Sequence, residues 1–407
     1  MSSAIAISVL LAISLQDAIT KAIAQSPELR ALEAGVAEAR ANATLGDAFR
    51  SAASISTTPG YATGLPTAVL GQVPAIATVE THRLLYDAAA RADQIGAASQ
   101  VDATIARLES RKREIAQNVA ELYARVAAGR IQSPSAQRRV TAYETIAARI
   151  EALRKEGRVR DLDVDRATLQ VANARRVALQ ARNRLELDQL RLNRMVGEPV
   201  TLSEAKGLAS GDASLSLSMT GDPELKSLDA RIAALQRAVG LQQRLFQPSI
   251  AAQAQYMRLF DRYRRYYLNF KPDDVVVGAT VTLPIWTGGH RGAAAARVRA
   301  QLQQLIFQRD LRKTEVELVL REAEVDLAQA VAESDLAART HAIAAESSRV
   351  AEELAKEGRG EANDVPLAQI ALADADDEVA KANAHKMVAQ ARLIILGGNS
   401  TRATYNP

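Results

Sequence analysis

The ten residues KEGRVRDLDV at positions 155–164 return near the end of the chain as KEGRGEANDV at positions 356–365. Both copies open with Lys-Glu-Gly-Arg and close with Asp-Val, and their glycines lie 201 positions apart in a chain of 407 residues. A glycine after a basic helix end lets the backbone adopt a positive φ where one helix stops and the next begins. We therefore expect each copy to separate two long, alanine-rich helices stacked end to end, in two homologous halves.

The helix starts repeat as well. Ser26-Pro27-Glu28-Leu29 and Asp222-Pro223-Glu224-Leu225 each place a capping side chain before a proline at the first helical position and an acidic residue in the first turn. The predicted organisation is a single domain at 15–407, made of two repeats at 15–198 and 222–398 and a linker at 199–221.

Between these helices the pattern changes to a period of two, which indicates strands. The second half alternates at 248–257 and 274–286, and the first half carries a weaker copy at 51–58 and 73–86. In the last predicted strand one face is apolar: Val275, Val277, Ala279, Val281 and Leu283. Four strands of about ten residues have the length that crosses a bilayer when tilted. Because four strands cannot close on themselves, the chain must oligomerise, or the strands must cap a soluble sheet.

An aromatic residue ends each predicted strand pair. Tyr86 and Trp286 lie 200 positions apart, and an aromatic at a strand end is what a membrane-interface girdle needs. The alternative is an aromatic plug in a soluble core.

Long helical patterns follow the strands in both halves. Apolar residues recur at helical spacing from Arg91 to about Ala128, and we expect residues 129–134 to turn the chain so that residues 136–155 run back. The second half repeats this pattern, with one helical segment from Arg291 to about Ala332 and a second from Asp335 to Lys356. Long helices with short loops form antiparallel coiled-coil hairpins. The fold class is therefore mainly α with a small β part.

Composition excludes several functions. The chain has no Cys, so disulfides, thiolate metal sites and Cys nucleophiles are excluded. Its net charge of +4 arises from 51 basic and 47 acidic residues without the clustering that nucleic-acid binding needs. The four histidines show no metal-ligand spacing, and we expect no enzyme activity, no cofactor and no metal. The four histidines are His82, His290, His341 and His385.

Residues 1–14 read MSSAIAISVLLAIS. They resemble the apolar region of a secretory signal without its basic start or cleavage site, and they are too short to span a bilayer as a helix. We interpret them as an atypical export signal, with a buried N-terminal segment as the alternative.

Taken in order, these features resemble the outer-membrane efflux (TolC-like) family. The resemblance rests on LQDAI at 15–19 with SPEL at 26–29, the echo at 222–225, LPIWTGGHR at 283–291, the duplicated KEGR motif, and the closing Leu-x-x-x-Gly-Gly at 393–398. It covers nearly the whole chain.

The resemblance implies a homotrimer in which each protomer gives four strands to one outer-membrane β-barrel. The helices would form a periplasmic α-barrel with an equatorial belt at the linker. It further implies a passive exit duct in the outer membrane of a Gram-negative-type envelope. Its partners would be outer-membrane lipid, a periplasmic adaptor and an inner-membrane pump, in a tripartite efflux or type I secretion system. Drugs, metals and proteins all remain admissible cargo.

Two charged clusters are candidates for the pore aperture. The acidic candidates share one helical face: Glu322, Asp326, Gln329 and Glu333. The basic candidates lie near the expected first-half tip: Arg125, Arg130, Arg138 and Arg139. We hypothesise that the acidic face lines the aperture and pairs with the arginines when the tip is closed; the alternative is a solvated charged surface. A second function also stays open, that of a soluble trimeric coiled-coil scaffold capped by the strands.

Overall fold

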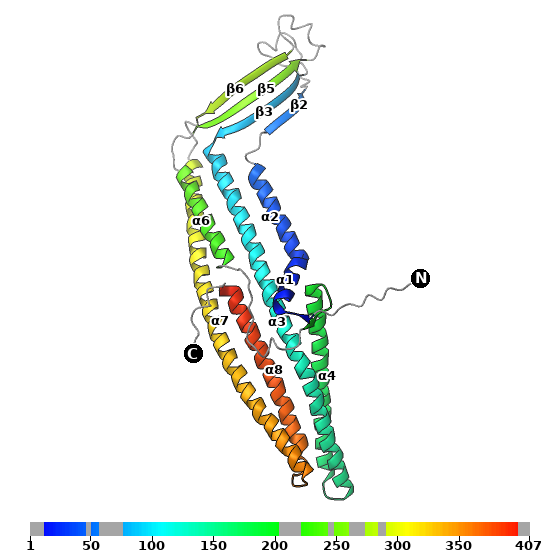
Figure 1. Ribbon diagram of the computed structural model, residues 1–407. Helices are drawn as coiled ribbons and strands as arrows, with labels where there is room; N and C mark the ends of the chain where they lie inside the picture. Colours follow the sequence, from blue (N-terminus) through cyan, green and yellow to red (C-terminus); the bar gives the residue numbers. More distant parts are fainter. Residues whose placement is uncertain are drawn as a thin grey trace, which may run out of the picture. The chain divides into compact units, whose positions relative to one another are not determined.

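The computed structural model describes residues 12–45, 50–56, 76–202, 221–242, 248–259, 273–283 and 290–397, in two compact units (Figure 1). One, the sheet unit, takes its residues from 32–107 and 224–312. The other, the hairpin unit, takes them from 1–31, 108–223 and 313–407. Each unit therefore draws on both halves of the duplicated sequence. In the described part of the chain, no helix is both long enough and apolar enough to cross a membrane.

The sheet unit contains the four expected strands in one antiparallel sheet of order β2-β3-β5-β6. The strands are β2 (Arg50–Ser56), β3 (Ile76–Tyr86), β5 (Ser249–Leu259) and β6 (Asp273–Thr282). Each half supplies one adjacent pair, and the β3–β5 pairing joins the halves. The alternating pattern therefore predicted the strands and their pairwise origin correctly.

Helices complete the sheet unit. They are most of α2 (Pro27–Leu45) and α6 (Pro223–Gln242), and the first parts of α3 (Ala88–Lys155) and α7 (His290–Lys356). Leu228 and Ile232 of α6 form a buried cluster with Leu305 of α7. Ion pairs flank this cluster, from Arg312 to Glu224 (3.3 Å) and from Arg309 to Asp229 (3.7 Å). The apolar stripe expected after Pro223 is thus the face that packs.

Two helical hairpins dominate the hairpin unit: α3 with α4 (Asp161–Val196), and α7 with α8 (Asp364–Gly397) (Figure 1). In the first, Arg125 pairs with Asp188 and Glu144 pairs with Arg175, so one residue number rises as the other falls. In the second, Ser334 meets Asn383 and His341 meets Asp376, in the same sense. Both pairs of helices are therefore antiparallel, as a coiled-coil hairpin requires.

The KEGR motifs form the tips of these hairpins, which corrects the expectation that they separate helices stacked end to end. Gly157 has φ +71° and Gly358 has φ +69°. Each tip has two matching backbone hydrogen bonds: Arg158 N to Leu153 O and Gly157 N to Arg154 O in the first, Arg359 N to Leu354 O and Gly358 N to Ala355 O in the second. This is the Schellman pattern, which satisfies the last carbonyls of a helix and reverses the chain.

The Asp-Val pair after each motif begins the returning helix. The Asp163 carboxylate accepts a hydrogen bond from the Arg160 backbone N–H (3.4 Å), and Asp364 accepts one from Glu361 N–H (2.8 Å). Backbone N–H groups at a helix start have no partner within the helix, so an acidic side chain stabilises them. The repeated ten residues therefore encode a complete tip, with a stop, a turn and a start.

The expected turn at residues 129–134 is wrong, because α3 continues through it as one helix with Pro134 inside. The corresponding break expected between Ala332 and Asp335 is wrong too, because α7 is also one continuous helix. Gly129 instead lets α3 approach α4 closely, since a Cβ at this position would lie 3.1 Å from Leu185 Cδ1 of α4. Pro134 removes one helical hydrogen bond. Next to it, the Ser135 hydroxyl donates to the Ile131 carbonyl (2.8 Å), a local bond that accompanies bends inside helices. The predicted first-half tip thus lies in a helix interior, and KEGR forms the true tip.

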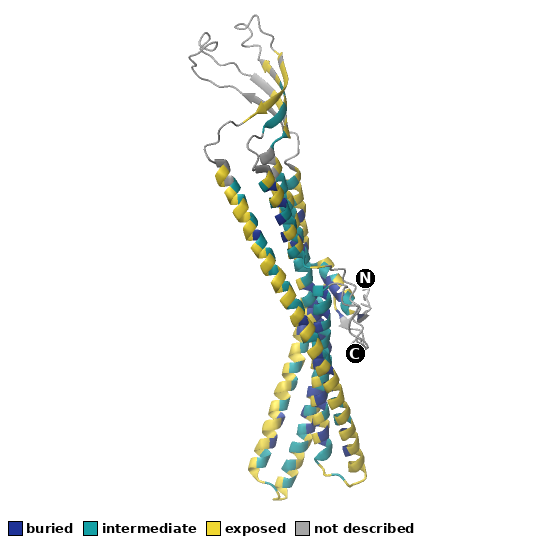
Figure 2. Cartoon of the chain, turned by 90° about the vertical axis from the view of Figure 1, so that its left-hand side faces the viewer, coloured by how far each residue is buried: buried dark blue, intermediate teal, exposed yellow. Residues whose placement is uncertain are grey.

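Alanine makes up a large part of the buried residues of the long helices. Figure 2 shows how the buried positions are distributed along these helices. On α8, buried alanines recur every seven residues, and α7 repeats this spacing. The α8 set is Ala368, Ala375, Ala382 and Ala389, and the α7 set is Ala323, Ala330 and Ala337. A seven-residue repeat keeps one face of a helix against its partner, and small side chains let the backbones approach closely.

A small two-stranded sheet closes the N-terminal side of the hairpin unit. It pairs β1 (Ala12–Ile13) in parallel with β4 (Thr201–Leu202), beside α1 (Leu15–Gln25). Ile13 is buried, and its carbonyl accepts a hydrogen bond from the Tyr123 hydroxyl (3.1 Å). Residues 1–11 of the signal-like segment and residues 203–220 of the predicted linker lie outside the described residues.

Candidate functional site

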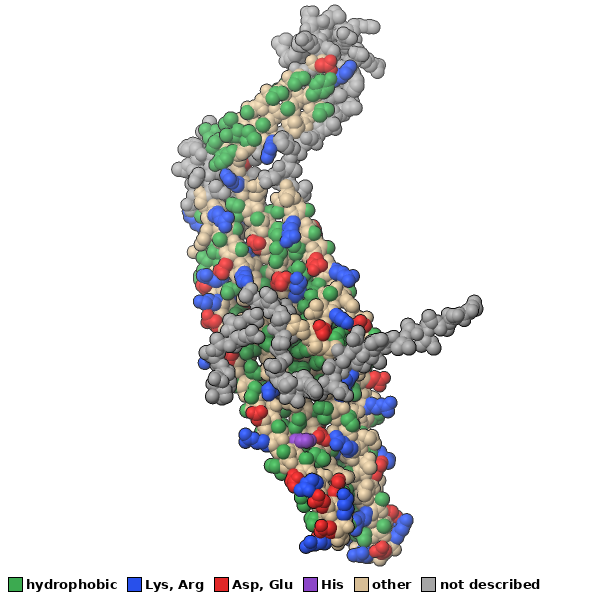
Figure 3. Space-filling model, in the orientation of Figure 1, with side chains coloured by type: hydrophobic (Ala, Val, Ile, Leu, Met, Phe, Trp, Pro, Cys, Tyr) green, Lys and Arg blue, Asp and Glu red, His purple; other side chains and the backbone are tan. Residues whose placement is uncertain are grey.

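One face of the sheet is apolar and exposed. Val79, Tyr256 and Val275 lie directly opposite one another on β3, β5 and β6, and all three are exposed. Along β6 the same face continues through Val277, which is 78% exposed, and Val281. Figure 3 shows few charged side chains on the visible sheet face, whereas the helices carry both signs. An exposed apolar area of this kind indicates contact with another apolar phase or chain.

The opposite face of the sheet is more polar. Glu80 pairs in register with Gln255, and Gln253 lies two residues away on β5. Two differently solvated faces fit a sheet that separates an apolar environment from water.

The two predicted interfacial aromatics can be followed only in part. Tyr86 is the last residue of β3 and is half-buried. It lies opposite Ile250 of β5, after an irregularity between Leu84 and Tyr86 that shifts the pairing of the two strands by one residue. Trp286 lies outside the described residues.

The acidic candidates on α7 surround a histidine. His385 of α8 places Nε2 3.0 Å from Asp326 and Nδ1 3.0 Å from Glu333. The Gln329 amide donates to the other oxygen of Glu333 (2.7 Å). These bonds, from Gln329 first and then His385, lower the pKa of Glu333, while the Glu333 contact raises the pKa of His385 against an opposing effect of burial. Glu322 is exposed one turn earlier on the helix.

The basic candidates on α3 pair with other carboxylates. Arg139 contacts Asp374 of α8 (2.6 Å), and Arg125 faces Asp188 of α4 (3.6 Å). Arg130 lies near Tyr123, whose pKa is raised by burial and partly lowered by the Arg130 charge. The ion pairs of Arg125, Arg138 and Arg139 in the described residues thus go to carboxylates of α4 and α8, and the predicted pairing with the acidic face of α7 stays a prediction.

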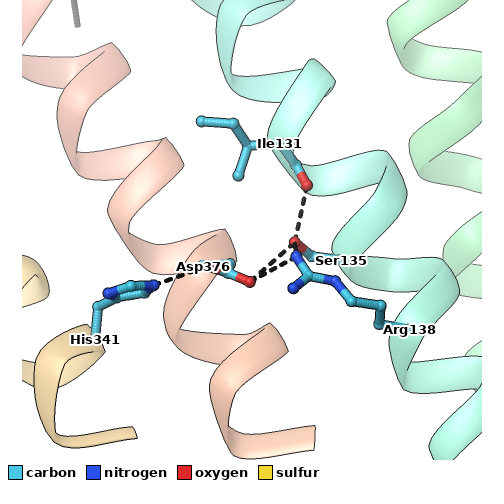
Figure 4. A network of polar contacts seen from close by, with 5 residues as sticks. All are labelled: Ile131, Ser135, Arg138, His341 and Asp376. Carbon is cyan, nitrogen blue, oxygen red and sulfur yellow. Dashed lines mark hydrogen bonds and ion pairs between the residues drawn. The ribbon is translucent and has the colours of Figure 1, made fainter. Parts of the chain in front are cut away.

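A polar network joins three helices from both halves of the chain around Asp376 (Figure 4). Arg138 of α3 donates to Asp376 Oδ2 (2.7 Å), and Ser135 lies 3.5 Å from the same atom. His341 of α7 lies 2.9 Å from Oδ1. The Asp376 side chain is only 15% exposed, so its charge is largely enclosed by these partners.

Reasoning from the sequence missed Asp374, Asp376 and the two paired histidines. One signal was available: His341 follows Ser334 and precedes Ser348 by seven residues, and both serines are buried. A residue at this spacing faces the partner helix rather than solvent. The side chains of the other two histidines lie outside those described.

Each hairpin also leaves an apolar seam exposed. Large exposed side chains recur along α7, mostly seven residues apart, and five leucines are exposed along α4 at less regular intervals. The α7 set is Leu318, Val325, Leu336, Ile343 and Val350, and the α4 set is Leu162, Leu169, Leu179, Leu187 and Leu190. Within one protomer these seams have no covering helix in the described part of the chain, since all ten residues are solvent-exposed.

Comparison with known proteins agrees with this arrangement. Residues 215–399 match the family model described as "Outer membrane efflux protein". None of the curated proteins compared with the chain matches it significantly. The second half of the chain is therefore similar to the outer membrane efflux (TolC-like) family, and the first half, its weaker sequence copy, lies outside the matched range.

Solved structures share the fold over nearly the whole chain. The outer membrane protein VceC of Vibrio cholerae matches with a TM-score of 0.72 and 17% identity, covering 94% of this chain and 96% of that one. The Campylobacter jejuni CmeC outer membrane channel matches with 0.72 and 13%, covering 94% and 85%. The open state of the Neisseria gonorrhoeae MtrE outer membrane channel matches with 0.72 and 17%, covering 94% and 89%.

Proposed function

We propose that the protein is the exit duct of a tripartite efflux pump or a type I secretion system. Three protomers would surround one conduit, with the four-stranded sheets in the outer membrane and the helices in the periplasm. Transport through it would be passive, with the energy supplied by an inner-membrane transporter that a periplasmic adaptor joins to the duct.

The observation that carries the proposal is that one protomer exposes two kinds of apolar surface. The sheet face around Val277 fits lipid, because a bilayer is the apolar phase that an outer-membrane protein meets. The α7 seam around Ile343 instead follows a seven-residue repeat, which fits a helix of another protomer. The exposed sheet face also argues against the soluble scaffold, which would leave that face in water.

The first test is assembly and conductance. The full chain, purified in detergent, should have the mass of three protomers by native mass spectrometry and should form steady ionic pores in planar bilayers. A monomer without conductance would overturn the proposal.

The second test is partnership. In a cell that lacks its own exit duct but keeps a pump and an adaptor, the protein should restore resistance to compounds that the pump exports. Restored secretion of a type I substrate would favour the secretion system instead. Failure with every adaptor encoded beside its gene would contradict the docking role.

A further inference from the structure

The two homologous hairpins are held by different chemistry. Across α3 and α4 the ion pairs use arginine: Arg175 with Glu144 (2.6 Å), Arg125 with Asp188 (3.6 Å) and Arg154 with Asp161 (3.6 Å). In the described parts of α7 and α8, the ion pairs that cross between the helices use histidine: His385 with Asp326 and Glu333, and His341 with Asp376. Arginine stays charged at every physiological pH, whereas histidine changes charge near neutrality.

His385 is placed so that only its charged form satisfies both neighbours. A neutral imidazole has one N–H donor and one acceptor nitrogen, so it can donate to one carboxylate while its lone pair faces the other. The imidazolium donates from both nitrogens, and both contacts are 3.0 Å long. Because Gln329 holds the second oxygen of Glu333, this carboxylate is oriented independently of the histidine.

The charges around His385 also favour its imidazolium form. From α7, His385 faces Asp326 and Glu333. On its own helix the flanking cations are Lys381, which pairs with Asp377 (2.7 Å), and Lys386. On α3, the antiparallel contact of Arg138 with Asp376 brings Arg125 and Arg130 to about this level, and these lie by Asp188 and Tyr123 respectively. The contacts that face the ring therefore come from carboxylates.

His341 extends the arrangement to the other half of the chain. Its ring contacts one oxygen of Asp376, and Arg138 of α3 holds the other (Figure 4). On α8, Asp374 is occupied by Arg139, and on α7 the charged residue two positions from His341 is Arg339. The His341 contact therefore links α7 to α8 and, through Asp376 and Arg138, to α3.

We propose that the α7–α8 hairpin contains a pH-dependent clamp, formed by His385 between Asp326 and Glu333, which tightens on acidification, whereas the arginine-paired α3–α4 hairpin does not respond. The folded protein raises the pKa of His385 above its ordinary value, about 6.5. A group of this kind contributes its full stabilisation below the unfolded pKa and loses it as the pH rises through the folded value. The clamp is therefore closed below about pH 6.5 and opens as the solution becomes alkaline.

Hydrogen–deuterium exchange of the full chain in detergent tests this, with the first hairpin as an internal control. After correction for intrinsic exchange, α7–α8 peptides around residues 326–341 and 376–385 should be about two- to five-fold better protected at pH 5.5 than at pH 8.5, the range expected of partly exposed ion pairs. Peptides of α3–α4 around residues 144 and 175 should change by less than that. Equal pH responses in the two hairpins, or none in α7–α8, would overturn the proposal.

Two variants assign the response. The variant His385→Gln keeps a hydrogen-bonding side chain that does not titrate, and should remove the pH dependence of α7–α8. The matched variant Arg175→Gln should lower α3–α4 protection equally at both pH values. A pH response that survives in His385→Gln would refute the clamp. If that variant does not fold, the wild-type comparison of the two hairpins still decides, and neither measurement requires the proposed transport role.

Discussion

At the scale of single residues, Asp376 of α8 contacts two other helices, α3 through Arg138 and α7 through His341. It receives Arg138 from the first half and His341 from the second while remaining mostly enclosed. A carboxylate withdrawn from water must keep its partners, because an uncompensated charge in such a place is costly.

Asp376→Asn should loosen this connection. The amide keeps the size of the side chain but removes the charge that holds Arg138, so protection from hydrogen exchange in neighbouring α8 peptides should fall by about five-fold, or about 1 kcal/mol. Asp377→Asn is the matched control, because its pair with Lys381 lies within one helix and should contribute about 0.3–0.5 kcal/mol. Equal effects of the two substitutions would contradict the assignment.

At the scale of elements, the hairpin tips depend on a backbone conformation that most residues avoid. Gly157 and Gly358 have matching positive φ values and matching hydrogen bonds, 201 positions apart. This match explains why the motif recurs with so little change: the turn requires glycine, and the returning helix requires an aspartate.

Gly358→Ala should destabilise the second tip. No atom lies within 4 Å of the added methyl group, so the cost is backbone strain alone, about 1–2 kcal/mol. Exchange around residues 354–364 should accelerate by about five- to thirty-fold. Gly96→Ala in α3 has equally open space in an ordinary helix and should stabilise it by about 0.5–1 kcal/mol. A neutral Gly358→Ala would show that the tip does not need the positive φ.

The sheet has its own element-scale test. Val277→Lys places a charge on the apolar face and should cost about 2–4 kcal/mol in the middle of a bilayer, so less protein should reach the membrane fraction. Gln253→Lys on the more polar face should leave this fraction close to wild type. Equal losses in both variants would contradict the assignment of the faces.

The sequence predicted the elements well and their connections less well. Alternation along residues 274–283 predicted a strand with an apolar face, and the repeated motif predicted two related halves. The sequence alone could not show which glycine turns the chain, because Gly129 and Gly157 both interrupt a helical pattern in the same way. One accommodates Leu185 and the other adopts a positive φ, and both reasons arise from packing. The histidine contacts were missed for the same cause, since their partners lie 35 to 59 residues away.

At the scale of the whole molecule, the exposed seams of α4 and α7 make the single protomer incomplete. Side chains such as Ile343, which is 72% exposed, gain by burial about 25 cal/mol for each Å² removed from water. Repeated along a helix, this gain would favour the association of protomers that the proposed function requires.

Ile343→Glu should therefore prevent assembly while the helices of the protomer persist. Native mass spectrometry should detect monomers in place of oligomers, with unchanged far-ultraviolet circular dichroism. Ala338→Glu adds the same charge at an exposed position off the seam and should assemble normally. An intact oligomer of Ile343→Glu would remove the α7 seam from the interface.

The alanine seams have a mechanical consequence. An alanine methyl group is small and has no alternative rotamers. Two helices that touch through such groups therefore present almost smooth surfaces to each other. When one helix slides along the other, few interdigitated side chains have to move. The position of one helix relative to the other is then fixed by the few polar contacts between them. In the proposed trimer, a conduit lined by such helices would change its diameter when the helices shift along one another, without repacking of the side chains between them.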